Sequence, residues 1–312
     1  MLSLVARRIA LSVPLVFVVT GLSFVLQAFI PGDAARGILG TNATPEQLAT
    51  LRHQLGLDQP FYSQYANWLG HLLHGSLGNS LVDGQSVTSA LNSRLPVTLC
   101  LLIGTTAFAL LLGVLIGTFT SASSGAVSRS VDILSVVGLA IPNFWLALLL
   151  ISALAVHLGW FPATGYVPFA NHPGDWAKSL ALPVLALGLG QVTVLAKQTR
   201  DSMSDVLASP FVQSLRANGA RERTVIFKHA LRNAAIPVVT AAGLLFVGAL
   251  SGVVIIEQIF VLPGLGAFAV QATAAHDIPV IQGVALYFTL IVIVVNLLVD
   301  LTYGWLNPRI RH

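Results

Sequence analysis

Six long apolar runs constrain this chain more than any other feature of its sequence. An α-helix needs about 20 apolar residues to cross the hydrocarbon core of a bilayer, where it must satisfy its own backbone hydrogen bonds. Only 9% of the 312 residues are charged, whereas soluble domains average about 25%. The sequence therefore predicts an all-α polytopic membrane protein with six transmembrane helices. The predicted spans are Ile9–Ile30, Val97–Phe119, Val131–Val156, Leu180–Ala196, Pro237–Ile259 and Val280–Trp305.

The first run admits a second interpretation. Arg7 and Arg8 followed by an apolar segment also resemble the start of a secretory signal peptide. The apolar part of a signal peptide is only about 7–15 residues long, however, and a cleavage site of small residues usually follows it. The run here is longer, and no such site follows directly. We therefore expect a retained first span.

The basic residues predict the orientation of the spans. With both termini in the cytoplasm, 12 of the 16 Lys and Arg residues fall on the inner side, and only Arg36, Arg52, Arg94 and Lys178 lie outside. An excess of positive charge inside is the usual bias of multi-pass membrane proteins. We expect residues 31–96 outside and a cytoplasmic loop at residues 197–236, between spans four and five. Because topology explains the basic residues, we expect no nucleic-acid partner.

The predicted external segment contains signals for a first short helix. Thr44 and Gln47 have the spacing of a capping box, and Pro45 suits the first turn of a helix. Leucines follow at helical spacing, and Gly56 is placed to end the helix. We therefore expect a helix between Pro45 and Gly56.

A second stretch of the external segment gathers large apolar side chains on one helical face. Phe61, Tyr65, Trp68 and Leu72 recur at helical spacing. Aromatic residues commonly anchor a helix at the membrane surface, and that is the interpretation we favour. The alternative is contact with an external partner protein, for which Phe61, Tyr65 and Trp68 are the candidate residues.

Several enzyme motifs are missing from the sequence. None of the three lysines follows a glycine, so there is no P-loop for a nucleotide. There is no H-E-x-x-H metal motif and no G-x-S-x-G nucleophile turn. His71 and His74 lie three residues apart, but two histidines without a third ligand are more typical of a surface than of a metal site. We expect no catalytic residue, no metal site and no cofactor in this chain.

The acidic residues of the predicted spans lie near span ends, at Asp132, Glu257 and Asp300. A proton-driven transporter usually needs a buried carboxylate or histidine relay, and the middle of each span lacks one. We therefore expect the energy for transport to come from elsewhere, with a self-contained secondary transporter as the alternative. Prolines also begin or interrupt the spans, and we expect kinks at Pro14, Pro142, Pro183 and Pro237.

The predicted cytoplasmic loop holds the densest charge of the chain. Within it, the sequence FVQSLRANGA predicts one or two helical turns that start near Pro210 and end near Gly219. The small residues Ala217, Gly219 and Ala220 let another protein surface approach the backbone closely. A loop that only fixed the topology would explain the arginines, but not the helix or a length well above the usual connection. We therefore expect a docking site for a cytoplasmic partner.

Several stretches in the same order resemble one family of proteins. LRANGARERTVIFKHALRNAAIPVVT resembles the loop by which ABC importer permeases dock on their ATPase subunits. ARRIALSVPLVFVVTGLSFVLQAFIPGDAA, LGLDQPFYSQYANWLGHLLHGSLGNSL and IPNFWLALLL resemble the first span, the external loop and the third span of the dipeptide, oligopeptide and nickel permeases. IIEQIFVLPGLG and DLTYGWLNPRIR resemble the exit of the fifth span and the C-terminal end. The chain is thereby identified as a member of that family, in the branch with a large first external loop.

The resemblance implies a single permease domain over residues 1–312, a type I importer bundle in the bacterial plasma (inner) membrane. Its implied partners are a homologous second permease, two cytoplasmic P-loop ATPase subunits that bind ATP and Mg, an external substrate-binding protein and membrane lipid. Peptides are the implied substrates, with nickel or another small solute as the alternative.

The resemblance also implies a coupling helix in the cytoplasmic loop that contacts the ATPase. Its residues are Gln213, Ser214, Leu215, Arg216, Ala217, Asn218, Gly219, Ala220, Arg221 and Glu222. Gln213–Leu215 stand where relatives carry Glu-Ala-Ala or Arg-Thr-Ala, and Asn218 stands where a lysine is frequent. Gly219 and the downstream Ile236-Pro237 pair keep the family pattern.

Overall fold

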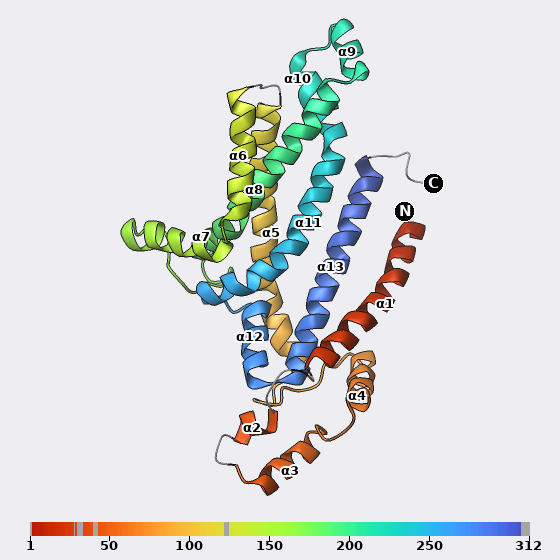
Figure 1. Cartoon of the computed structure of the whole chain (residues 1–312), viewed down its shortest axis with the longest axis vertical. Helices are drawn as coiled ribbons and strands as arrows, with labels where there is room; N and C mark the ends of the chain where they lie inside the picture. Colours follow the sequence, from red (N-terminus) through yellow and green to blue (C-terminus); the bar gives the residue numbers. More distant parts are fainter. Residues whose placement is uncertain (1, 28, 30–33, 40–42, 122–124, 307–312) are drawn as a thin grey trace. The chain divides into compact units, whose positions relative to one another are not determined.

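A computed structural model describes residues 2–27, 29, 34–39, 43–121 and 125–306. Ile30, the predicted end of the first span, and the basic residues Arg309 and Arg311 lie outside these ranges. The helices, shown in Figure 1, are α1 (Leu2–Gln27), α2 (Ala34–Leu39), α3 (Pro45–Gln54), α4 (Phe61–Leu73), α5 (Val87–Thr120), α6 (Ala126–Ala140), α7 (Asn143–Leu150), α8 (Pro173–Leu207), α9 (Pro210–Ala217), α10 (Glu222–Thr224), α11 (Leu231–Ile259), α12 (Leu265–Ala275) and α13 (Ile278–Leu306), with the π-helical segments η1 (Ile151–His157) and η2 (Val225–Ala230). The predicted all-α architecture is confirmed.

Five helical stretches of the described chain are long and apolar enough to cross a membrane. These stretches are Ala6–Gln27, Val87–Thr120, Pro173–Leu207, Glu222–Ile259 and Ile278–Leu306. The first covers the predicted first span up to Gln27, and the others contain the predicted spans two, four, five and six. α8, which contains the predicted fourth span, begins before it and ends after it. Together with α9, α10, η2 and the start of α11, it makes most of residues 197–236, predicted as a loop, helical. α5 likewise takes in the last residues of the predicted external segment.

The third predicted span is broken. α6 and the α7–η1 stretch are bent by 95° relative to each other at the intervening Ile141 and Pro142. Pro142 has no backbone N–H, and a proline disfavours the helical conformation in the residue before it. Ile141 accordingly has extended φ and ψ values of −78° and 119°. The count of six spans holds only if this bent pair is one span.

The other three predicted interruptions do not end their helices. Pro14, Pro183 and Pro237 lie inside α1, α8 and α11, which continue past them. A proline inside a helix costs one backbone hydrogen bond, and neighbouring helices and local adjustments compensate for this cost within a membrane. Of these four prolines, only Pro142 lies at a break between helices.

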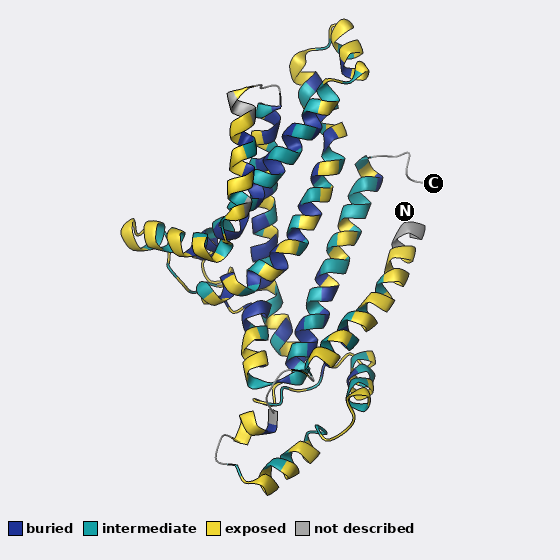
Figure 2. Cartoon of the chain, viewed as in Figure 1, coloured by how far each residue is buried: buried dark blue, intermediate teal, exposed yellow. Residues whose placement is uncertain are grey.

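The chain forms two compact units, each described here by itself. The α8 unit comprises residues 99–262 and those from 295 onward, and the α4 unit comprises residues 2–98 and 263–294. In the α8 unit, 61% of the most apolar stretch of α8 is buried (Figure 2). α8 packs against α6, α7 and α11, and is therefore the central helix of its unit.

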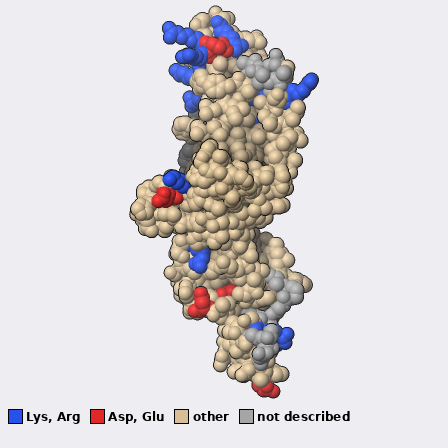
Figure 3. Space-filling model, turned by 90° about the vertical axis from the view of Figure 1, so that its left-hand side faces the viewer, with Lys and Arg blue, Asp and Glu red and all other residues tan. Residues whose placement is uncertain are grey.

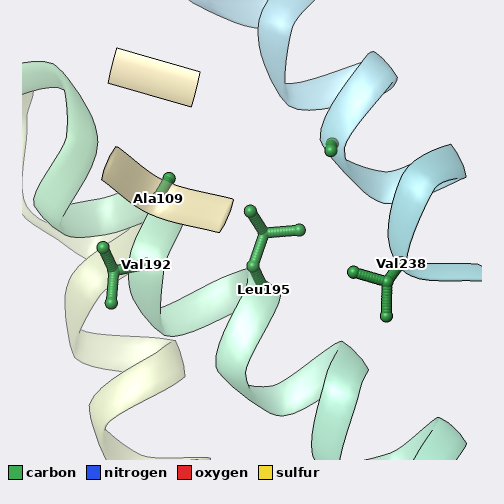
Figure 4. Packing of buried hydrophobic residues seen from close by; sticks show 5 residues of the cluster. Ala109, Val192, Leu195 and Val238 are labelled. Carbon is green, nitrogen blue, oxygen red and sulfur yellow. The ribbon is translucent and has the colours of Figure 1, made fainter. Parts of the chain in front are cut away.

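Small side chains allow the helices of the α8 unit to approach one another closely. Leu195 of α8 meets Ala109 of α5 and Val238 of α11 in one buried cluster (Figure 4). Beside it, a Cβ atom added at Gly117 of α5 would lie 2.5 Å from the carbonyl oxygen of Ala196. Side chains at such contacts would force the helices apart, as in other membrane bundles where small residues line the interface.

The α4 unit is held together by a different kind of contact. The carboxylate of Asp277, 4% exposed, accepts hydrogen bonds from the Ser80 hydroxyl at 2.5 Å and the Leu81 backbone N–H at 3.2 Å. These bonds tie the turn before α5 to the junction of α12 and α13. Burial of the carboxylate is acceptable because both of its oxygens have donors.

Candidate functional site

The α9 segment (residues 209–222) is built as a short helix with a sharp end. Pro210 occupies the first turn, where its missing N–H is not needed. Gly219 has a φ of +76°, a left-handed conformation that favours glycine. The N–H groups of Gly219 and Ala220 donate to the carbonyl oxygens of Arg216 and Leu215, each at 3.0 Å. This pair of bonds is the glycine C-cap of a helix, and it confirms the predicted end near Gly219.

The α9 segment is attached through one side of its helix. Val212 is fully buried, and α9 contacts both α8 and η2. Phe211 meets His229 of η2 edge to face, with ring centroids 6.0 Å apart. The opposite side of α9 is therefore left open to the surroundings.

An ion pair bridges the two arms of the turn after α9. The Arg216 Nε and Nη2 atoms donate to the two carboxylate oxygens of Glu222 at 3.1 and 2.6 Å. Both side chains are about half exposed, at 43% and 55%. The bidentate geometry orients both side chains on the surface beside Gly219.

Most of the predicted docking residues are accessible. Leu215 and Ala220 are half-buried, and the other eight of the ten are exposed. Figure 3 shows Lys and Arg side chains gathered over the end of the unit that carries α9 and α10. The segment therefore presents a small, basic, protruding surface.

A cluster of four charged residues joins α6 to the last turns of α8, and sequence reasoning did not identify it. Lys197 donates to Asp132 at 3.0 Å and to Asp201 at 2.9 Å, and Arg200 donates to the same two carboxylates at 2.7 Å each. The Arg200 side chain is only 8% exposed. We call this group the α6–α8 ion cluster, because Asp132 belongs to α6 and the others to α8. The i, i+4 spacing of Lys197 and Asp201 was the only available sequence signal.

The α6–α8 ion cluster fixes the end of α8 to its surroundings. The Ser204 hydroxyl, one turn further on, donates to the carbonyl oxygen of Ser121 at 2.9 Å. The ion pairs and the Ser204 hydrogen bond thus connect the last turns of α8 to α6 and to Ser121.

The candidate external contact residues occupy different environments. Tyr65 lies against α1: its hydroxyl is 3.0 Å from Thr20 Oγ1 and donates to the Phe17 carbonyl at 3.3 Å. Trp68 stacks on Tyr65 and is 7% exposed, whereas Phe61 is 54% exposed. Most of the aromatic face of α4 thus packs on the protein itself, and Phe61 is the member of the set that remains accessible.

Histidines in the described residues do not assemble a metal site. His74 Nδ1 lies 2.8 Å from the carbonyl oxygen of Gly70, within its own helix. No group of three or more His, Cys, Asp or Glu side chains with metal-binding geometry occurs in the part of the chain that the structure describes.

Comparison with known proteins gives consistent matches along the whole chain. The family model described as "binding-protein-dependent transport system inner membrane component" matches residues 86–312, and the model of the N-terminal part of such components matches residues 1–102. A permease protein named for a peptide transport system in Brucella abortus (strain 2308) is 39% identical over 313 residues, covering 100% of both chains. The glutathione transport system permease protein GsiC of Salmonella choleraesuis is 38% identical, again covering 100% of both chains.

The fold also matches a solved structure. A chain of the inward-facing methionine ABC transporter MetNI aligns with a TM-score of 0.57 and 16% identity, covering 70% of this chain and 97% of that one. At that identity the match concerns the helical arrangement alone.

Proposed function

Because the chain belongs to the family of inner membrane components of binding-protein-dependent transport systems, we propose that it is one of two homologous permease subunits of an ATP-driven importer for short peptides. Two relatives of full length, named for peptide and glutathione transport, support the substrate class. The remaining partners are two cytoplasmic ATPase subunits and an external binding protein that delivers the peptide. This subunit forms half of the translocation pathway and hydrolyses nothing itself.

The proposed topology has six spans with both termini in the cytoplasm. Residues 31–96 then lie outside and residues 197–236 inside, which puts the basic α9 segment on the cytoplasmic side, in agreement with the positive-inside bias. The bent pair of α6 and α7–η1 counts as the third span. Of the three candidate aromatic residues, Phe61 is the exposed one, and with it the external segment meets the binding protein.

The observation that carries the proposal is the exposed α9 segment ending at Gly219. A short helix with one side attached and eight of its ten predicted contact residues exposed fits a groove on another protein. The ATPases, closing on ATP, displace this helix as a rigid body. The displacement passes through α8 and the α6–α8 ion cluster to the rest of the unit, and alternating access follows as a rocking of packed helices.

Reconstitution tests the proposed function. The four-subunit complex in proteoliposomes, with binding protein outside and ATP inside, should accumulate a radiolabelled tripeptide. Omission of ATP or of the binding protein should reduce uptake to background. Uptake by this chain alone in ATP-free vesicles would identify a secondary transporter instead. Accumulation of nickel but of no peptide would contradict the substrate class and leave the transport mechanism standing.

A further inference from the structure

The helix α4 presents three distinct faces. On the first, Tyr65 lies against α1 and Trp68 is buried beside it. The second is polar, because Gln64, Asn67 and His71 recur on it at helical spacing. The third lies between these two and is apolar. Packing on α1 therefore accounts for only one of the two apolar faces of this helix.

The third face of α4 carries large apolar side chains that the described part of the chain leaves uncovered. Tyr62 and Leu73, at its two ends, are 69% and 78% exposed. Leu69 is half-buried, and Ala66 is exposed. Single exposed apolar residues are ordinary on a protein surface, but a continuous line of them along a helix indicates an apolar partner. We call Tyr62, Ala66, Leu69 and Leu73 the outer stripe of α4.

The contacts between α4 and α1 place the outer stripe at the level of the membrane. Tyr65 reaches the Phe17 carbonyl and the Thr20 hydroxyl, and its ring meets Phe24 edge to face with centroids 5.5 Å apart. All three of these partners lie inside the first stretch that is able to cross a membrane. Phe17 precedes Gln27, the last residue of α1, by ten residues, which is about 15 Å along a helix. α4 is therefore held against the span itself and not beyond its end.

The turns of α1 that hold α4 are themselves open to an apolar environment. Val18, Leu22 and Leu26 recur every four residues on α1, and each is more than half exposed. Such a row on a membrane span faces either lipid or another span. A stripe on a helix held against the same turns meets the same surroundings. This continuity favours lipid as the occupant of the outer stripe over a water-soluble protein.

The composition of α4 indicates how it would contact lipid. The helix contains no Asp, Glu, Lys or Arg residue, so charged headgroups neither attract nor repel it. Tyrosine is typical of the membrane surface, because its ring is apolar and its hydroxyl reaches the headgroups. Tyr62 and the two leucines of the outer stripe together provide the apolar contact. Its strength then depends on apolar area and not on anionic lipid.

We propose that α4 lies along the outer leaflet of the membrane, with the outer stripe in contact with lipid and the polar face turned to water. The inference rests on the proposed function, whose topology puts residues 31–96 outside. The sequence suggested the face of Tyr65 and Trp68 for such a contact, but that face packs on the protein, and the outer stripe takes its place. Anchored in this way, α4 fixes the height at which Phe61 is presented to the binding protein.

Fluorescence quenching on the intact complex tests the lipid contact. With Cys100 replaced by serine, one cysteine at a time is introduced at Tyr62, Leu73 or Asn67 and labelled with the fluorophore NBD. The four-subunit complex is then placed in nanodiscs whose lipids carry a spin label high on the acyl chain. Quenching in Tyr62→Cys and Leu73→Cys should be at least about twofold stronger than in Asn67→Cys, because an interfacial helix buries only its apolar face. Iodide in the buffer should quench in the reverse order.

Asn67→Cys is the matched control for these variants. Asn67 is an exposed residue of the same helix, but it belongs to the polar face. All three labels replace exposed side chains, so none of them disturbs a buried contact. Exchanging zwitterionic for anionic lipid, or raising the salt concentration, should change the lipid quenching by less than about twofold. A strong dependence on anionic lipid would contradict a contact made through apolar area alone.

The other possible occupants of the outer stripe give different results. Labels at Tyr62 and Leu73 that become shielded from both quenchers only when binding protein is added identify a docking surface for that protein and overturn the lipid contact. Shielding from both quenchers in its absence means that another subunit covers the stripe, with the same consequence. Equal lipid quenching at all three positions also overturns the proposal. Peptide uptake decides the proposed function separately, because the quenching needs neither ATP nor peptide.

Discussion

Gly219 owes its place to backbone conformation rather than to crowding. Its φ of +76° favours glycine, yet no atom lies within 4 Å of the position where a Cβ would stand. A side chain at this position therefore costs only the left-handed conformation, about 1–2 kcal/mol, and no steric clash. What such a side chain changes is the surface offered to a partner.

Replacing Gly219 with glutamate should abolish peptide uptake and detach the ATPase subunits while the chain still reaches the membrane. The added carboxylate projects from the end of α9 beside the Arg216–Glu222 pair and obstructs close approach. Co-purification of the ATPase subunits and ATP-dependent uptake measure the effect.

Gly75 provides the matched control for this substitution. It has a φ of +77° with open space around it, and it ends α4 with the same pair of backbone bonds, from Gly75 to Leu72 and from Ser76 to His71. Gly75→Glu should retain the ATPase subunits at the wild-type level. Equal loss of the ATPases in both variants, or full uptake in Gly219→Glu, would remove α9 from the docking surface.

At the scale of elements, the α6–α8 ion cluster connects two helices that local sequence does not pair. Asp132→Asn removes one of the two carboxylates shared by Lys197 and Arg200, and Arg200 is nearly buried. We expect a lower midpoint of thermal unfolding and less peptide imported per ATP hydrolysed. Thermal unfolding of the purified chain and a parallel assay of uptake and hydrolysis measure the two effects.

The same helix supplies the control for the ion cluster. Asp175 and Lys178 face each other at 4.0 Å at the start of α8, with both side chains more than half exposed. Exposed pairs of this kind contribute little to stability. Asp175→Asn should therefore leave the unfolding midpoint and the amount of peptide imported per ATP hydrolysed at wild-type values. Equal decreases in Asp175→Asn and Asp132→Asn would argue against a specific role for the α6–α8 ion cluster.

The turn after α3 should respond to pH. The hydrogen bond and charge of Asp58 raise the pKa of His53 above its ordinary 6.5, and the hydrogen bond from His53 lowers the pKa of Asp58 below its ordinary 3.8. The ionised Asp58 carboxylate stabilises this turn fully above pH 3.8, and the stabilisation is lost as the pH falls through the lowered pKa of Asp58. The protonated His53 imidazole stabilises the turn fully below pH 6.5, and the stabilisation is lost as the pH rises through the raised pKa of His53.

The order of this turn should therefore be greatest between about pH 4 and pH 6.5. Hydrogen exchange at the backbone of residues 55–59 measures it. In His53→Gln the decline above neutral pH should disappear, and a decline that persists in this variant would assign the pH response to another group.

Local signals in the sequence predicted the ends of elements well. The capping box of Thr44 and Gln47 forms as expected, and the glycines at 56 and 219 end their helices, because these features depend on residues a few positions apart. Partners distant in the sequence were not predicted. Asp132 meets Arg200 only after α6 and α8 pack. The aromatic face of α4 could not reveal whether Tyr65 would meet lipid, a partner or α1, because the same amphipathic pattern suits all three.

The four prolines of the predicted spans also had effects that the sequence could not predict. Each removes one backbone donor, but three leave their helices continuous and Pro142 coincides with a 95° bend. The difference depends on how neighbouring helices support the free carbonyl and on the conformation of the preceding residue, which a single sequence does not specify.

At the scale of the whole molecule, the orientation of α9 depends on whether the bent pair crosses the membrane. With Cys100, the single native cysteine, replaced by serine, one cysteine is introduced at a time at Asn171, Ser214 and Ser76. A membrane-impermeant maleimide should label Asn171→Cys and Ser76→Cys in intact cells, and Ser214→Cys only after permeabilisation. Labelling of Ser214→Cys but not of Asn171→Cys from outside would mean five crossings.

The glycine contacts around α8 determine where this molecule is able to flex. A Cβ atom at Gly117 would come within 2.5 Å of α8 backbone, and one at Gly138 of α6 within 2.4 Å of the Thr193 hydroxyl oxygen. Closely packed surfaces resist sliding, so we expect α5, α6 and α8 to move together as one rigid group. α7, beyond the interruption at Ile141–Pro142, packs on α8 and α11 and is expected to move with that group.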